Sequence, residues 1–266
     1  MKKDYLTVRD KEVHKSNELI QNTRYELTIQ QQKILLYLIA QLQPSDKKFH
    51  EYELSVLDYC KLCGVSHGGI TYESIKASVK GMRDKSFWIR QGNEEVLVSW
   101  LSKAKVNPKT GFIKLQLDDD LKPYLLDLKK NFTSYELIFT LLLKCKYSVR
   151  LYELIKSFHY DELKPYCRTF ALDVFKERLG VEDSYAHFKD FKRWVIIPAV
   201  NEVNEKTDKV VSYELVKNGR NVVGVTLTVS TKSMDERIKL RADIDRELTQ
   251  DQLNLFNITD EVVADE

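Results

Sequence analysis

The pattern of apolar and polar residues occurs twice along the chain. Residues 56–65 (VLDYCKLCGV) align with residues 172–181 (LDVFKERLGV) at an offset of 116 positions. In both copies a short amphipathic helix is predicted to end at a glycine, Gly64 or Gly180, because glycine readily adopts the left-handed conformation that closes a helix. The chain therefore contains two copies of one structural unit.

Each short helix is followed by a polar turn and then by a longer amphipathic helix, predicted over residues 71–84 in the first copy and 186–207 in the second. Alternating segments that are typical of strands come next. They cover residues 87–90, 96–101 and 112–117 in the first copy, and residues 212–217 and 222–230, joined at Asn218-Gly219-Arg220, in the second. A helix-turn-helix followed by a β-hairpin is a winged helix.

Further helices are predicted upstream of the two units, over residues 28–42, 134–144 and 148–160. The stretch 128–133 has little periodicity and is the predicted domain boundary. We therefore expect an α+β fold of two tandem winged-helix domains. The predicted divisions are an N-terminal domain at 1–131, a C-terminal domain at 132–234, and an acidic, flexible tail at 235–266.

The exposed face of the second long helix is the predicted site of base recognition, since a major groove accommodates one α-helix. Helical spacing directs one side to the core (Phe188, Phe191, Val195, Ala199, Val203) and the other to solvent (Lys189, Arg193, Ile197, Asn201, Asn204, with Lys192 and Lys206 at the rim). Arginine and lysine can bind guanine, asparagine can bind adenine, and isoleucine can contact a thymine methyl group. A solvated helix face with a few basic residues is the alternative. Pro198 either kinks this helix or ends it.

Basic residues also mark the first unit and both hairpins. The long helix of the first unit has an apolar row (Ile75, Val79, Met82) and a basic one (Lys76, Lys80, Arg83, Lys85). The basic residues of the hairpins are Lys103, Lys105 and Lys109 in the first copy and Lys217, Arg220 and Lys232 in the second. Wing residues usually contact phosphates, which positions a protein on DNA without reading its sequence.

Composition and charge are compatible with this interpretation. The 266 residues are 43% hydrophobic and 31% charged, and no apolar run is long enough to span a membrane, so we expect a cytoplasmic protein. The overall charge is only +2, but residues 242–266 hold eight acidic side chains and one basic one. The other 241 residues carry +9, which suits a partner rich in phosphate.

No catalytic arrangement is recognisable. A phosphate-binding GxxxxGK[ST] loop is missing, and the five histidines are scattered. Cys60 and Cys63 form a CxxC with His67 nearby, but they lie on a predicted helix and have no second CxxC, which favours buried thiols over a zinc site. Asp118-Asp119-Asp120 is interpreted as a helix start. We expect no metal, no cofactor and no enzymatic activity. A nicking enzyme or recombinase is the competing class, and it would need a tyrosine or serine nucleophile.

Several motifs resemble those of one family, the iteron-plasmid replication initiator (Rep) proteins. The resemblance covers roughly residues 12–232. The segments that carry it are 27–34 (LTIQQQKI), 132–135 (FTSY), 143–157 (LKCKYSVRLYELIKS), 201–208 (NEVNEKTD), 211–214 (VSYE) and Gly219-Arg220.

The resemblance implies a function in replication without catalysis. Such initiators bind direct repeats at a plasmid origin as monomers, help to open adjacent AT-rich DNA, and recruit the host initiator and replicative helicase. As dimers joined through the first domain, many repress their own gene at an inverted repeat. The resemblance places the main base-reading helix at Lys189, Lys192, Arg193 and Ile197. A stand-alone transcriptional repressor is the alternative function.

The tail contains one further motif. Gln252, Leu253, Leu255 and Phe256 belong to the sequence QLNLF, which resembles the peptide with which bacterial proteins bind the replicative sliding clamp. A terminal turn or short helix that packs Leu253 and Phe256 against the body is the alternative interpretation.

Overall fold

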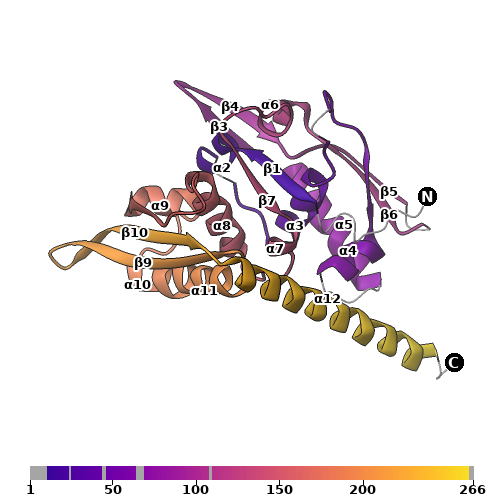
Figure 1. The fold of residues 1–266 in the computed structure, drawn as a ribbon. Helices are drawn as coiled ribbons and strands as arrows, with labels where there is room; N and C mark the ends of the chain where they lie inside the picture. Colours follow the sequence, from indigo (N-terminus) through magenta and orange to yellow (C-terminus); the bar gives the residue numbers. More distant parts are fainter. Residues whose placement is uncertain (1–10, 24, 44–45, 64–68, 108–109, 264–266) are drawn as a thin grey trace.

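The computed structural model describes the backbone of residues 11–263, apart from positions 24, 44–45, 64–68 and 108–109. Side chains are described up to Leu248, except those of residues 61–62, 69–71 and 91. Two lobes lie side by side, with a long C-terminal helix beneath them (Figure 1). The first lobe is coloured indigo to magenta and the second salmon to orange.

Both lobes have the same succession of elements, which confirms the two tandem winged helices. The first unit contains α3 (Ile29–Ile39), β2 (Tyr52–Ser55), α4 (Val56–Cys63), α5 (Gly69–Asp84), β5 (Leu101–Asn107) and β6 (Phe112–Leu117). The second contains α8 (Lys146–Phe158), β8 (Tyr166–Ala171), α9 (Leu172–Arg178), α10 (Phe188–Phe191), η2 (Lys192–Ile196), α11 (Ile197–Lys206), β9 (Lys209–Asn218) and β10 (Asn221–Thr231). The strand orders β2-β6-β5 and β8-β10-β9 are equivalent.

The first unit has an additional hairpin between its recognition helix and its wing. The segments predicted as strands at 87–90 and 96–101 form β3 (Ser86–Gln91) and β4 (Glu94–Ser99), which pair only with each other in the sheets of the described chain. A two-residue turn joins them, with Gly92 at a φ of 62°. The wing itself is β5–β6, and β5 was not predicted as a separate strand.

The helix predicted over residues 134–144 is largely wrong. Phe132–Glu136 forms strand β7, which pairs antiparallel with β1 (Glu12–Ser16), and only α7 (Ile138–Leu141) is helical there. Thr133 and Tyr135 are buried while their neighbours are more exposed, which is the two-residue alternation of a strand. The sequence predicted to be a boundary therefore leads into a strand that pairs with the start of the chain.

Helix α8 contacts elements of both lobes, and it contains charged residues in the interior. Glu153 accepts hydrogen bonds from Lys15 of β1 at 2.6 Å and from the Tyr135 hydroxyl of β7 at 2.5 Å. The side chains of Lys15 and Glu153 are only 2% and 1% exposed. Burial, and then the charge of Glu153, raise the pKa of Tyr135 well above its usual value. Since α8 also packs against α11, this cluster joins the N-terminal strands to the second unit.

The glycine predicted to close the first helix of the second unit does so. Gly180 has a φ of 69°. Its N–H donates to the Glu177 carbonyl and that of Val181 donates to the Lys176 carbonyl, which is the Schellman arrangement. A Cβ at Gly180 would lie 3.1 Å from the Tyr25 carbonyl oxygen of the first lobe, so side-chain size is restricted there as well.

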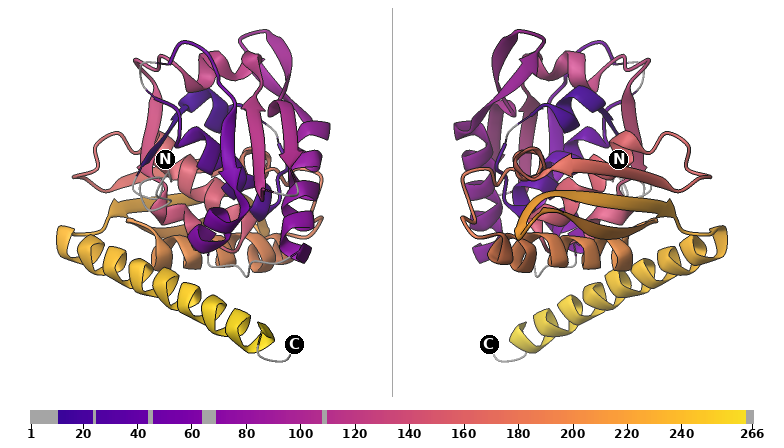
Figure 2. Two further views of the ribbon diagram at one scale, coloured as in Figure 1. Left: turned by 90° about the vertical axis from the view of Figure 1, so that its right-hand side faces the viewer. Right: turned by 90° about the vertical axis from the view of Figure 1, so that its left-hand side faces the viewer.

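The predicted flexible tail is instead a long helix, α12 (Met234–Val263), which extends away from the body at its C-terminal end (Figures 1 and 2). Ser233 and Glu236 form a capping box at its start, with Ser233 Oγ accepting from the Glu236 N–H and Glu236 accepting from the Ser233 N–H. Ile244 and Leu248 are buried, and α12 packs against α4 of the first lobe. No helix in the described part of the chain is long and apolar enough to cross a membrane.

We predict that replacing Lys15 with Met lowers the free energy of unfolding by about 3 kcal/mol, because the buried Glu153 carboxylate then keeps only Tyr135 and the more distant Arg150 as partners. Urea denaturation would measure the change. The matched control is Lys129→Met, which removes the exposed Lys129–Asp127 ion pair and should cost less than about 1 kcal/mol. Equal effects of the two substitutions would contradict the role of the buried pair.

Candidate nucleic-acid interface

The recognition helix of the second unit is continuous from α10 through η2 to α11, and its middle turn is a π-helix. The Ile197 N–H donates to the Lys192 carbonyl, five residues back. Pro198 has no N–H to donate to the carbonyl of Trp194, so the ordinary α-helical bond cannot form at this point. The proline therefore widens the helix by one π turn without ending it.

The predicted facing of this helix is confirmed at most positions, with Phe188 half-buried. Phe191, Val195, Ala199 and Val203 are buried. Lys189, Arg193, Ile197 and Asn201 are exposed, and Lys192 is half-buried beside them. These five residues are called the reading face below. Among the described residues, its three basic side chains have no carboxylate partner.

Three residues predicted to face DNA have other contacts. Asn204 bonds the backbone of Val211, with its Nδ2 donating to the carbonyl at 2.9 Å and its Oδ1 accepting from the N–H at 2.6 Å. Lys206 forms an ion pair with Glu247 of α12 at 2.8 Å. Lys232 donates to the carbonyls of Asn204 and Thr207, so it caps α11 and does not extend the wing.

The turn before the recognition helix is held from within the helix-turn-helix. Lys176 of α9 donates to the carbonyl oxygens of Ser184 and Tyr185 at 2.8 and 3.0 Å. Tyr185 has a positive φ of 58°, and its hydroxyl lies 3.2 Å from that of Tyr147 on α8. These contacts set where the recognition helix begins relative to α8.

The first unit presents the predicted basic row on α5. Ile75, Val79 and Met82 are buried. The predicted basic residues Lys76, Lys80, Arg83 and Lys85 are all exposed. Lys76 pairs with Glu73 and Lys80 with Asp84 along the helix surface, and Lys85 donates to the Glu26 carbonyl. Exposed pairs of this kind are weak, so the side chains can be redirected to phosphates at little cost.

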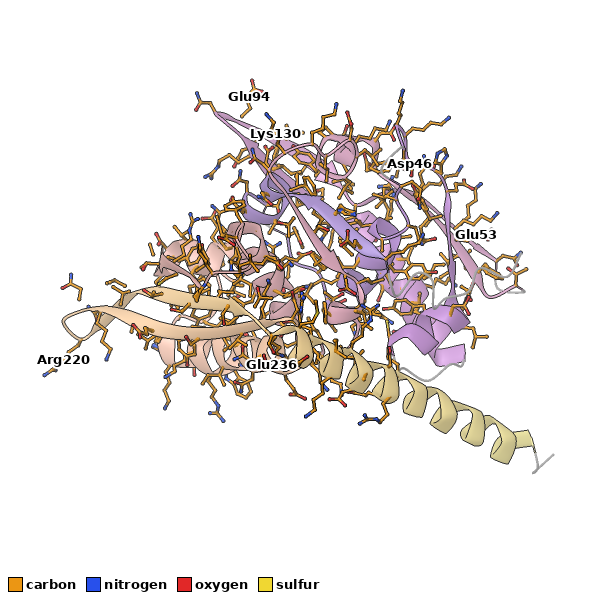
Figure 3. All side chains as sticks on the ribbon, in the orientation of Figure 1. Asp46, Glu53, Glu94, Lys130, Arg220 and Glu236 are labelled. Carbon is orange, nitrogen blue, oxygen red and sulfur yellow. The ribbon has the colours of Figure 1, made fainter. Side chains whose placement is uncertain are left out.

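The two wings differ in whether their basic residues contact a carboxylate. Lys217 and Arg220 are exposed near the tip of the β9–β10 hairpin, where Gly219 has a φ of 59° (Figure 3). In the first wing, Lys103 and Lys105 both contact Glu51, and their hydrogen bonds lower the pKa of that carboxylate. Lys109 lies outside the described residues.

The residues considered for metal chemistry are structural. Cys60 and Cys63 are buried, and burial raises the pKa of the Cys60 thiol to about 12. Asp118 caps the short helix η1 (Asp119–Leu121) by accepting from the Asp120 N–H, as predicted. His67 lies outside the described residues, and in the remainder of the described chain no group of three or more potential ligands is gathered.

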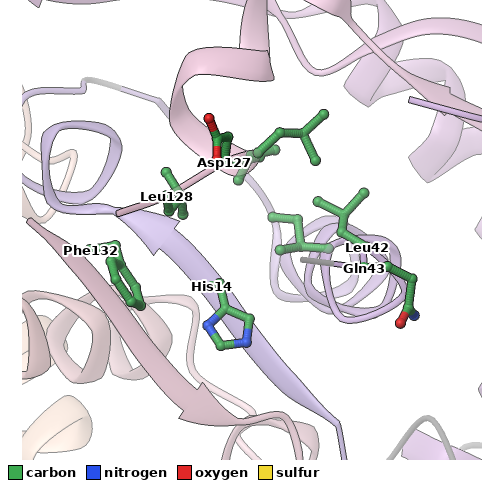
Figure 4. Close-up of a pocket in the computed structure, with 9 residues that line it drawn as sticks. His14, Leu42, Gln43, Asp127, Leu128 and Phe132 are labelled. Carbon is green, nitrogen blue, oxygen red and sulfur yellow. The ribbon is translucent and has the colours of Figure 1, made fainter. Parts of the chain in front are cut away.

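An apolar pocket of about 240 Å³ lies on the first lobe, apart from the basic helices and wings. His14 of β1 and Phe132 of β7 line one side of it, facing the residues that follow α3 and α6 (Lys122–Leu125) (Figure 4). It includes none of the predicted DNA-contacting residues.

Two family models match the chain. The model for "Initiator Replication protein, WH1" matches residues 12–156, which is more than half of the chain, and the model for "Initiator Rep protein, WH2" matches residues 171–229. The chain belongs to the initiator replication protein family. This confirms the resemblance found in the sequence.

Relatives within the initiator family are distant. A "Replication initiation protein" of Escherichia coli is 28% identical over 201 residues, which are 72% of this chain and 61% of the relative. The "PI protein" of Escherichia coli is 29% identical over 160 residues, or 56% of this chain and 52% of the relative. The chain thus spans between half and two thirds of the length of these relatives.

A solved initiator structure has the same fold. The Pi initiator protein in complex with iteron DNA superposes with a TM-score of 0.69 at 20% identity, covering 85% of this chain and 99% of that one. The first initiator model extends to residue 156 and so includes β7 and most of α8, whereas α12 lies outside both models. The domain limits predicted at 131 and 234 remain a prediction.

One residue of the initiator's recognition helix was not singled out from the sequence. Trp194 is 55% exposed and lies between Arg193 and the buried Val195. In a regular helix this position lies at the edge of the exposed row, where an indole is not an obvious candidate for a DNA contact. Trp194 lies within the π turn at Lys192–Ile196, which the sequence signals through Pro198.

The different contacts of Asn201 and Asn204 lead to a testable distinction. Asn204→Ala should lower the free energy of unfolding by about 1–3 kcal/mol, because it leaves backbone groups of Val211 without partners. Asn201→Ala should leave stability within about 0.5 kcal/mol of the unaltered protein. Thermal or urea unfolding measures both variants, and an unchanged stability in Asn204→Ala would contradict the assigned structural role.

Proposed function

We propose that this chain is a plasmid replication initiator that binds repeated double-stranded DNA sites at the origin. The observation that carries the proposal is the reading face, where Lys189, Lys192 and Arg193 project from a helix backed by a basic wing. Membership of the initiator family supports replication over other uses of the same fold. We expect the protein to act on plasmid DNA in the cytoplasm.

Two linked DNA-binding units suit repeated sites. Once the second unit is bound, engagement of the first is intramolecular, which raises the affinity without any new contact. We assign base recognition to the reading face and phosphate contacts to Lys217 and Arg220, with further phosphate contacts from α5 and Lys105 of the first unit. This division follows the general rule that backbone contacts position a protein and base contacts specify its site.

The finer steps belong to the same proposal. We propose that the bound protein helps to open adjacent DNA and recruits the host initiator and replicative helicase. As a homodimer it would repress its own gene at an inverted repeat. Self-association through the first domain is supported by Trp88 and Leu97, which pair across the β3–β4 hairpin and are 50% and 48% exposed. Glu94 marks the tip of this hairpin (Figure 3).

Sliding-clamp binding remains a proposal from the sequence motif. Gln252, Leu253, Leu255 and Phe256 lie in the distal half of α12, where the side chains are outside the described residues. The backbone of this segment is helical. A clamp-bound form would therefore use either this helix or an unwound part of it.

Footprinting of the DNA that flanks the gene tests the function. We expect protection of several direct repeats beside AT-rich DNA, with an affinity that falls steeply as salt rises. Arg193→Ala should weaken binding about tenfold, the effect of losing one good base contact. Arg246→Ala is the matched control, since this arginine is exposed on α12 away from the reading face.

Other footprints would change the conclusion. Protection of one inverted repeat alone, at the promoter, would favour a stand-alone repressor. No salt-sensitive protection at all would contradict DNA binding. Equal weakening by Arg193→Ala and Arg246→Ala would contradict the assignment of the reading face.

We further propose that the protein has no catalytic step. The sequence contains no nucleophile with metal or arginine support in a recognisable arrangement. Incubation of the purified protein with supercoiled origin DNA and Mg²⁺ should therefore give no nicked product on a gel. Nicking that persists in a highly purified sample, and that a single tyrosine substitution abolishes, would assign the protein to the enzymes.

A further inference from the structure

The reading face is extended by a patch of exposed apolar surface. Trp194 is 55% exposed and Ile197, three residues later, is 37% exposed. Elsewhere on this helix the apolar side chains face the core. An exposed indole beside an arginine is unfavourable for an isolated protein and is typical of a surface that is covered on binding.

The backbone fixes the direction of this patch. Trp194 lies in the π turn over Lys192–Ile196, next to Pro198, and is exposed there while Val195 and Ile196 are buried. Single π turns inside α-helices frequently occur at functional sites. The position of the indole therefore follows from the backbone and does not depend on a flexible side chain.

Arg193 stabilises the orientation of the indole. Its guanidinium carbon lies 4.8 Å from the centre of the Trp194 ring, within the range of a cation–π contact. The same stacking reduces the freedom of the guanidinium, whose donors would bind a guanine edge. The two side chains thus form one preorganised unit.

The chemistry of the major groove identifies the ligand of this unit. Base edges there present hydrogen-bond donors and acceptors, and their one apolar feature is the C5-methyl group of thymine. We propose that Trp194 is a specificity-determining residue that packs against thymine methyl groups, with Arg193 held beside it for a neighbouring base. The inference rests on the proposed function, since it requires DNA in contact with the reading face.

Insertion of the indole between base pairs is a less suitable role. Apolar wedges of that kind act mainly from the minor groove, on strongly kinked DNA. The recognition helix of a helix-turn-helix lies in the major groove, where its side chains meet base edges. A wedge would also be insensitive to the thymine methyl group, so the test below separates the two roles.

Deoxyuridine substitution tests the inference, because deoxyuridine lacks only the methyl group of thymidine. Each thymine of the footprinted site is replaced in turn, and the affinity of the full chain is measured by fluorescence anisotropy. We expect a loss of about fourfold at one or two positions, the effect expected of one buried methyl group. In Trp194→Ala the loss at those positions should vanish, and in Trp194→Phe it should be partly retained.

Tyr160→Ala is the matched control, since Tyr160 is an aromatic residue on the α8–β8 loop that is 76% exposed. It should keep every deoxyuridine effect of the unaltered chain. Because Trp194 is exposed, Trp194→Ala should also keep the thermal unfolding temperature. If Trp194→Ala unfolds at a lower temperature than the unaltered chain, Trp194→Phe takes its place in the comparison. Complete loss of the methyl effect in Trp194→Phe would then contradict the inference.

The outcomes separate this inference from the proposed function. If the unaltered chain protects no site, the proposed function fails and the inference fails with it. If a site is protected but Trp194→Ala keeps the same losses, or no thymine shows a loss, only the inference is overturned. Losses that vanish in Ile197→Ala but not in Trp194→Ala would also overturn it.

Discussion

The carboxylate of Glu153 lies in the interior of the molecule, where it accepts hydrogen bonds from Lys15 and Tyr135. A buried charge is tolerated only when its partners hold it in good geometry, so β1, β7 and α8 cannot shift independently of one another. Strands β1 and β7, which are far apart in the sequence, are thereby fixed to α8, the helix that packs against α11 of the second unit. The relative position of the two recognition helices depends on this junction.

Other polar residues of α8 extend the same constraint towards the DNA-binding elements. Arg150 donates to the Tyr25 hydroxyl of the first lobe and to the Arg178 carbonyl at the end of α9. Tyr152 donates to Asp208, next to the start of β9. Helix α8 therefore contacts the first lobe with one side and the start of β9 with another, and it also bonds the end of the first helix of the helix-turn-helix. Under the proposed function, two recognition helices held in this way would favour DNA sites with a fixed spacing, because a change of spacing would have to break buried bonds.

The features that could be predicted from the sequence are those that local interactions determine. Gly180 and Gly219 marked a helix end and a turn because each needs a positive φ, and the strand at residues 112–117 was found by its alternation. Strand β7 was missed because its partner β1 lies more than a hundred residues earlier, and local helical periodicity hid the pairing. Helix α12 could have been found from Ser233 and Glu236, whose capping box was outweighed by the acidic composition. The π turn that contains Trp194 was not predicted, because Pro198 is only a partial signal for it.

The acidic helix α12 affects where positive charge remains available. Glu247 pairs with Lys206 at the C-terminal end of the recognition helix and raises the pKa of that lysine, chiefly through the hydrogen bond between them. Arg241 is likewise occupied by Glu136. In the N-terminal half of the helix, Lys189, Lys192 and Arg193 form no ion pair with a carboxylate among the described residues, although Asp190 lies beside Lys189. Under the proposed function, the half of the helix that carries Trp194 is therefore the part whose basic side chains are most available to phosphate.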